Sequence, residues 1–214
     1  MGGRGSSSGG GGLKTTHPDG SGSSGKKNFS NGLGFPNYKT GDEALGKQGK
    51  PMSMTMATVG ANPHYDKSGT YAEFNYNCQR CVVANEARRR GYDVTAQPTY
   101  KGDTMPHGEN WNKAFVNPQP QSMSTRSQVE TTMASYGNGA RAVMTFGWKN
   151  GHDGHAITVE YNRGKITYLD PQLGSKYISS ELYSQMSKNT ITLTRVDNLK
   201  FSDDVKHAVT KDKW

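Results

Sequence analysis

Long runs of apolar residues are missing from this chain of 214 residues, of which only 31% are hydrophobic. No segment approaches the roughly 20 apolar residues of a membrane-spanning helix, so we expect no transmembrane segment and no membrane partner. The N-terminus also has no apolar signal-peptide core, so we expect another device to carry the protein if it leaves a cell. No internal repeat occurs at solenoid spacing, which excludes the common repeat architectures.

The apolar deficit is greatest in residues 1–60, which are rich in Gly, Ser and Lys and carry mostly isolated apolar residues. Such a composition cannot bury enough apolar surface to offset the entropy lost on ordering. We therefore predict a disordered linker over residues 1–60, either natural or added. The remaining residues, 61–214, suffice for one domain with a proper core and leave little for a second.

The formal net charge of +8 indicates good solubility and permits acidic partners. The basic residues are scattered, apart from the triplet Arg88, Arg89 and Arg90. This triplet falls late in a predicted helix, where cations suit the negative end of the helix dipole. We therefore do not expect nucleic acid to be the main partner.

Two helices are predicted first, and strands follow them. Asn77 is a candidate cap for a helix from Cys78 to Arg90, which Gly91 ends. A short strand is expected over 92–96 and a second helix over 128–136. Period-two patterns then predict strands over 140–148, 155–161, 165–170 and 190–196. This order of elements predicts an α+β domain with an antiparallel sheet.

Both cysteines lie in one segment, Asn77-Cys78-Gln79-Arg80-Cys81. Three interpretations other than catalysis stay open. A zinc site would need two more ligands, which His152 and His155 could supply. A redox Cys-x-x-Cys motif is possible, although it usually belongs to a parallel thioredoxin-like fold. The two side chains could also be inert and buried.

Thiol catalysis explains more of the pattern. A cysteine in the first turn of a helix faces unsatisfied N–H groups and the positive end of the dipole, which favour the thiolate. Helix-start geometry favours Cys78 as the nucleophile, with Cys81 as the alternative. His155 follows a glycine-rich turn and can handle the proton. Asp170 ends the paired strand, where it can orient the imidazole.

Six segments together resemble the papain-fold toxin family, also called Tox-PL. They are NCQRCVVA (77–84), EARRRGYDVTA (86–96), GNGARAV (137–143), GHAITVE (154–160), ITYLDPQLG (166–174) and TRVDNL (194–199). They come in the family's order and cover most of the chain after Ala61. The resemblance implies a papain-like thiol hydrolase fold. In that fold a helix carrying the cysteine packs on an antiparallel sheet that carries the histidine and the aspartate.

The resemblance implies hydrolysis of a glutamine side-chain amide by Cys78, His155 and Asp170, without a metal ion or organic cofactor. Backbone N–H groups at the start of the helix are expected to stabilise the oxyanion. Three side chains could assist in this or in positioning: Asn77, Gln79 and Gln172. Gln172 could equally form only a turn hydrogen bond.

The same residues could support a papain-like protease or a transglutaminase-type acyl transferase, and sequence motifs do not separate these reactions. A non-catalytic structural part of a phage particle is a further alternative. The family occurs in bacterial polymorphic toxins and in proteins associated with phage heads. We therefore expect a protein substrate with a reactive glutamine and a possible immunity protein as partners. The expected location is the cytoplasm of a target cell or the phage virion.

Overall fold

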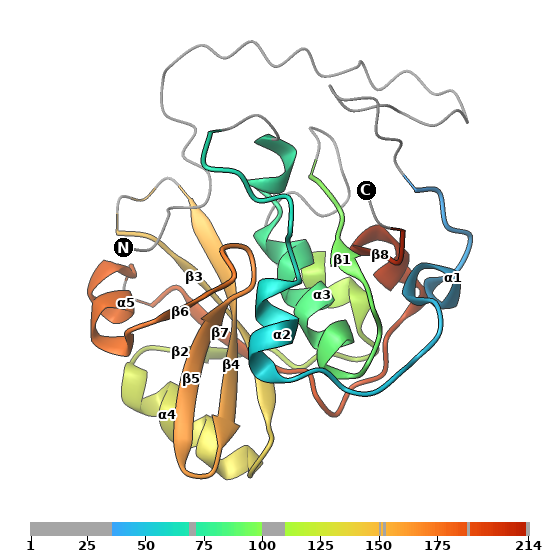
Figure 1. Cartoon of the computed structure of the whole chain (residues 1–214). Coiled ribbons are helices and arrows are strands. Elements are labelled where there is room, and N and C mark those ends of the chain that lie inside the picture. Colours follow the sequence, from blue (N-terminus) through green and yellow to red (C-terminus); the bar gives the residue numbers. More distant parts are fainter. Residues whose placement is uncertain are drawn as a thin grey trace.

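The computed structural model describes residues 36–68, 72–99, 110–149, 151, 153–187 and 189–212 (Figure 1). Its α-helices are α1 (Gly41–Leu45), α2 (Met54–Val59), α3 (Cys78–Arg89), α4 (Arg126–Tyr136) and α5 (Ser179–Gln185). Short 3₁₀ turns cover Ala72–Phe74, Asn110–Ala114 and Asp203–His207. Within the described residues, no helix combines the length and the apolar character that crossing a bilayer requires.

Six strands form one antiparallel sheet in the order β2-β7-β3-β4-β5-β6. Their bounds are β2 (Gln121–Met123), β3 (Arg141–Gly147), β4 (Gly154–Asn162), β5 (Lys165–Asp170), β6 (Ser175–Tyr177) and β7 (Ile191–Arg195). A separate two-stranded sheet pairs β1 (Thr95–Ala96) with β8 (Val209–Thr210). The strand expected over 92–96 is therefore shorter than predicted. The strands β3, β4, β5 and β7 lie where the period-two patterns of the sequence predicted them.

The two faces of the six-stranded sheet pack against different helices. On one face, Val143 of β3 and Ala156 of β4 join the core that contains the apolar residues of α3. On the other face, the next residues along these strands, Met144 and Ile157, pack with α4 and α5. This alternation follows from the period of two in a strand. The expected α+β fold, with the cysteine-bearing helix on an antiparallel sheet, is confirmed.

The folded unit begins well before residue 61, where the sequence analysis placed it. Helices α1 and α2 have side-chain caps, since Thr40 accepts a hydrogen bond from Glu43 N–H and Ser53 accepts one from Met56 N–H. Ala44, Leu45 and Ala57 are buried in the core. Few but well-placed apolar residues are enough here because larger elements already supply most of the core. Residues 1–35 of the predicted linker lie outside the described residues.

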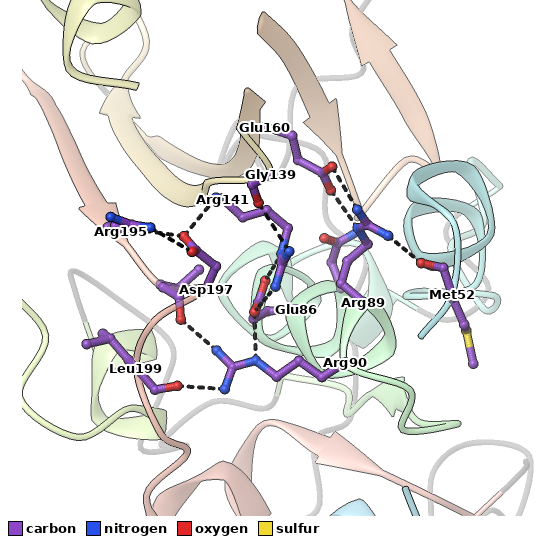
Figure 2. Close-up of polar contacts among 12 residues, drawn as sticks. Met52, Glu86, Arg89, Arg90, Gly139, Arg141, Glu160, Arg195, Asp197 and Leu199 are labelled. Atoms are coloured by element: carbon purple, nitrogen blue, oxygen red, sulfur yellow. Dashed lines mark hydrogen bonds and ion pairs between the residues drawn. The ribbon is translucent and has the colours of Figure 1, made fainter. Parts of the chain in front are cut away.

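Buried ion pairs join the C-terminal half of α3 to the sheet (Figure 2). Glu86, only 1% exposed, accepts hydrogen bonds from Arg90 on its own helix and from Arg141 on β3. Arg89 binds both carboxylate oxygens of Glu160 on β4, at 2.9 and 3.2 Å. Arg88 donates to the carbonyl of Val94. The arginine triplet is therefore used inside the fold and does not form an open basic surface.

Candidate active site

Cys78 is the first residue of α3, and its side chain is partly exposed. The carbonyl of Asn77 accepts the N–H groups of Arg80 and Cys81, which leaves the N–H groups of Cys78 and Gln79 without acceptors in the helix. The sulfur thus lies at the positive end of a helix of 12 residues.

The side chain of Asn77 does not cap the helix, contrary to our expectation. Its amide nitrogen donates to Asn62 Oδ1 and to the carbonyl of Gln97, at 3.2 and 3.0 Å. Its amide oxygen accepts from Asn62 and from the thiol of Cys81. Asn62 also donates to the carbonyls of Phe74 and Gln172, so these amides tie together the loops around the start of α3.

Cys81 has a different environment from Cys78, although only three positions separate them. It is fully buried in the core, and its sulfur lies 3.2 Å from Asn77 Oδ1. Burial, together with the charges of Cys78 and Asp170, raises the pKa of Cys81 well above its ordinary value. Cys81 therefore remains a protonated thiol near neutral pH and is a poor nucleophile.

The β4–β5 hairpin brings His155 and Asp170 together. The register pairs Thr158 with Leu169, so the start of β4 lies beside the end of β5. His155 Nε2 lies 2.9 Å from Asp170 Oδ2, and both side chains are fully buried. This contact is the one expected from the sequence, in which Asp170 ends the strand that pairs with the strand of His155.

Asp170 accepts four hydrogen bonds. Oδ2 accepts from His155 and, at 2.6 Å, from the hydroxyl of Tyr177 on β6. Oδ1 accepts the backbone N–H groups of Gln172 and Leu173, at 3.0 and 3.1 Å. Burial acts to raise the pKa of Asp170, but the charge and hydrogen bond of His155, with the other donors, lower it overall. The carboxylate is therefore ionised at neutral pH and also caps the turn that follows β5.

The imidazole of His155 is fixed on one side and available on the other. Nδ1 is buried, and none of the described residues offers it a hydrogen-bond partner in good geometry. Burial lowers the pKa of His155, but Asp170 and then the nearby thiol of Cys78 outweigh this and raise it to about 10. The ring also stacks on Trp148, with centroids 5.8 Å apart and planes 23° apart. Trp148 therefore covers the ring and helps to keep water from the pair.

The three side chains expected to help with positioning are held differently. Asn77 is fully occupied by its partners near the helix start. Gln79 is mostly buried, and its side-chain oxygen accepts the N–H of Trp111 at 3.1 Å. Gln172 is 1% exposed, and neither polar atom of its side chain finds a partner within the described part of the chain. Of the three, Gln172 has an unused side-chain amide.

Sequence reasoning missed Tyr177 and Asn62, both of which contact the residues around the site. The hairpin turn after Asp170 could have indicated that a strand returns beside it, but β6 is too short to show a period. Asn62 gave no signal, because its partners lie in distant segments. His152, one of the possible zinc ligands, lies outside the described residues. Within the described ranges, no three His, Cys, Asp or Glu side chains are grouped so that they could hold a metal ion.

Comparison with known proteins agrees with this geometry. A family model described as "Papain fold toxin 1, glutamine deamidase" matches residues 76–175. The matched segment includes Cys78, His155 and Asp170 and ends two residues before Tyr177. No curated protein matches the chain. The expected resemblance is thus confirmed over this segment: residues 76–175 match the model of a papain-fold toxin family described as a glutamine deamidase.

Proposed function

We propose that this chain is a protein glutamine deamidase in which Cys78 is the nucleophile, His155 the general base and acid, and Asp170 the orienting carboxylate. The observation that carries the proposal is the buried His155–Asp170 pair beside a cysteine at a helix start. This is the arrangement by which thiol enzymes activate sulfur: a base within reach of the nucleophile and a third group that fixes the base. The family match supplies the amide of glutamine as the substrate group.

At the start of the reaction, His155 Nδ1 already holds the proton taken from the Cys78 thiol, so the pair is a thiolate beside an imidazolium. The sulfur then attacks the carboxamide carbon of a glutamine side chain, and the carbonyl oxygen becomes an oxyanion. The N–H groups of Cys78 and Gln79 point out of the helix start and are suited to stabilise this charge. Gln172, with its unused amide, is a further candidate donor. The C–N bond breaks as the imidazolium gives its proton to the departing ammonia.

In the second half, water hydrolyses the thioester. His155 Nδ1 takes a proton from the attacking water, the C–S bond breaks, and the thiolate of Cys78 is regenerated beside the imidazolium. The product is a glutamate side chain. Throughout, Asp170 holds Nε2 at 2.9 Å, which keeps Nδ1 directed to the reacting atoms and stabilises the charged ring.

Cys78 carries the nucleophile role better than Cys81. Its sulfur is partly exposed at the helix start and close enough to His155 to raise the pKa of the ring. Cys81 is enclosed by core residues and held by Asn77. Substrate access therefore favours Cys78, while the raised pKa of Cys81 keeps that sulfur protonated.

The proposal includes the surroundings that the family implies. The substrate is a protein with a reactive glutamine, met in the cytoplasm of a target cell after delivery, or during infection if the chain travels with a phage particle. An immunity protein that protects the producing cell is the expected antagonist. These partners follow from the kind of family to which the matched segment belongs.

The test is a comparison of the wild-type protein with its Cys78→Ala variant on extracts of candidate target cells. We expect the wild type to release ammonia and to convert a glutamine of one or a few proteins to glutamate, detected as a small mass gain in intact proteins. The variant should do neither. Fragments in place of the mass gain would indicate a protease, and products cross-linked to amines would indicate acyl transfer. Absence of any Cys78-dependent product would contradict thiol catalysis.

A further inference from the structure

Tyr177 contacts the same carboxylate oxygen that holds the imidazole. Its hydroxyl donates to Asp170 Oδ2 at 2.6 Å, and His155 Nε2 approaches that oxygen at 2.9 Å. A length of 2.6 Å is typical of a charge-assisted O–H···O⁻ bond, which is stronger than a bond between neutral groups. The negative charge on Oδ2 is therefore divided between two donors.

The β5–β6 hairpin fixes this contact. The two strands pair with Tyr168 opposite Tyr177 and Asp170 opposite Ser175. Asp170 caps the connecting turn through its other oxygen, Oδ1. The carboxylate is thus enclosed by its own hairpin, with the turn on one oxygen and Tyr177 and His155 on the other.

The phenol is a constant donor at every working pH. Burial, and then the charge and hydrogen bond of Asp170, raise the pKa of Tyr177 above its ordinary value, and Cys78 and Tyr65 act in the same direction. The ring therefore stays protonated. Among the described residues, the titratable groups facing the His155–Asp170 pair are then Cys78 and Cys81 from α3, Tyr65 from the loop after α2, and Tyr177 from β6.

We propose that Tyr177 is a positioning residue for the proposed deamidase reaction: its hydroxyl keeps Asp170 ionised and limits how strongly the carboxylate stabilises the imidazolium of His155. The inference rests on the proposed function, because it assigns the pair a catalytic role. His155 must give its proton to ammonia and later take one from water, so a pair held too strongly in the charged form would be a weak acid and a slow donor. A second donor on Oδ2 weakens the stabilisation that Asp170 gives to the imidazolium of His155.

The test is direct titration of the His155 ring by NMR in the full chain. In Tyr177→Phe the whole charge of Oδ2 faces His155, so we expect the pKa of the ring to rise by roughly 0.5 unit, a fraction of the worth of one charge-assisted bond. The carboxyl carbon of Asp170 should also titrate at a higher pH than in the wild type, because one donor is lost. The matched control is Tyr183→Phe, which removes a half-buried hydroxyl that bonds Tyr168 and not Asp170. It should leave both titrations unchanged.

A fall in melting temperature without any change in these titrations, or a downward shift of the ring's pKa, would overturn the proposal. If Tyr177→Phe does not fold, an NMR measurement on the wild-type protein still tests the contact between Tyr177 and Asp170. The hydroxyl proton of Tyr177 should give a downfield, slowly exchanging resonance, and rapid exchange would contradict the contact. The titrations need no substrate. A raised pKa in a protein without deamidase activity would therefore count against the reaction and not against the effect of Tyr177.

Discussion

Arg89 and Glu160 form a two-pronged ion pair between the helix that bears Cys78 and the strand that bears His155 (Figure 2). From Cys78 to Arg89 the helix advances about 17 Å, at about 1.5 Å per residue. From His155 to Glu160 the strand advances about 17 Å, at about 3.3 Å per residue. The helix and the strand therefore advance by the same length between these residues. At one end the Arg89–Glu160 ion pair joins them, and at the other end the sulfur of Cys78 lies near the imidazole of His155.

Breaking this ion pair should destabilise the fold strongly. In Glu160→Gln, Arg89 is left mostly buried beside a neutral partner, so we expect a loss of about 3 kcal/mol in the free energy of unfolding. Urea denaturation measures it. The matched control is Arg126→Gln, which breaks the exposed pair with Glu130 and should cost little stability, because solvent screens that pair. Equal losses in the two variants would show that burial of the pair is not what matters.

The two cysteines should respond oppositely to substitution. Cys78→Ala should abolish ammonia release and leave the fold intact, because the side chain is at the helix start and partly exposed. Cys81→Ala should keep most of the activity and lose about 1 kcal/mol of stability, from a small cavity and the lost contact to Asn77. Ammonia release and thermal unfolding measured side by side separate the effects. An active Cys78→Ala protein with an inactive Cys81→Ala protein would reverse the assignment.

Replacing Asp170 should slow the chemical step and also weaken the hairpin. Asp170→Asn keeps one side-chain oxygen as an acceptor. Its NH₂ group replaces the other oxygen and faces groups whose hydrogen bonds the carboxylate accepts in the wild type. We expect turnover to fall on the order of 10²-fold, less than the 10⁴-fold of a serine triad, because a thiol is intrinsically easier to ionise than a hydroxyl. Asp197→Asn is the control, since Asp197 bonds Arg195 and the backbone of Arg141, away from the site. It should lower stability and spare turnover. Unchanged turnover in folded Asp170→Asn would remove Asp170 from the catalytic group.

The stabilising effect of the His155–Asp170 pair should be lost both at high pH and at low pH. The pKa of His155 is raised from 6.5 to about 10, so its contribution is complete below 6.5 and is lost as pH rises through about 10. The pKa of Asp170 is lowered from 3.8, so its contribution is complete above 3.8 and is lost as pH falls through the folded value. The difference in unfolding free energy between wild type and Asp170→Asn should therefore be largest at about pH 5 to 6. A difference that grows between pH 6 and pH 10 would contradict the sign.

The segment before residue 61 should be needed for stability. We expect a chain starting at residue 61 to be at least about 3 kcal/mol less stable than one starting at residue 36, because Leu45 and its alanine neighbours leave the core. Within the full chain, Leu45→Ala should cost about 2 kcal/mol or more, whereas Met56→Ala, at a side chain 60% exposed, should cost little. Equal stability of the two truncated chains would restore the boundary predicted from composition.

The sequence was most informative where local patterns and tertiary structure agree. Period-two patterns located β4 and β5, and with them the contact between His155 and Asp170. The helix from Cys78 was predicted from the residues that flank it, Asn77 and Gly91, and it ends at Arg89, one residue earlier than expected. The side chain of Asn77 was misjudged because tertiary partners, Asn62 and Gln97, compete successfully with the local cap. Tyr177 was missed because a strand of three residues has no readable period.

The described fold is closed by its two ends. The hydroxyls of Tyr38 and Thr210 lie 2.6 Å apart across 172 positions of sequence, and Gly41 N–H donates to Asp203. Strand β1 likewise obtains its partner only from β8. None of these contacts can form until residues 203–210 have been synthesised, and contacts between such distant segments make folding slow. A ribosome-bound chain that stops short of β8 therefore lacks these closing contacts. Maturation of the fold would therefore follow the synthesis of β8, although α1 and β1 are synthesised earlier.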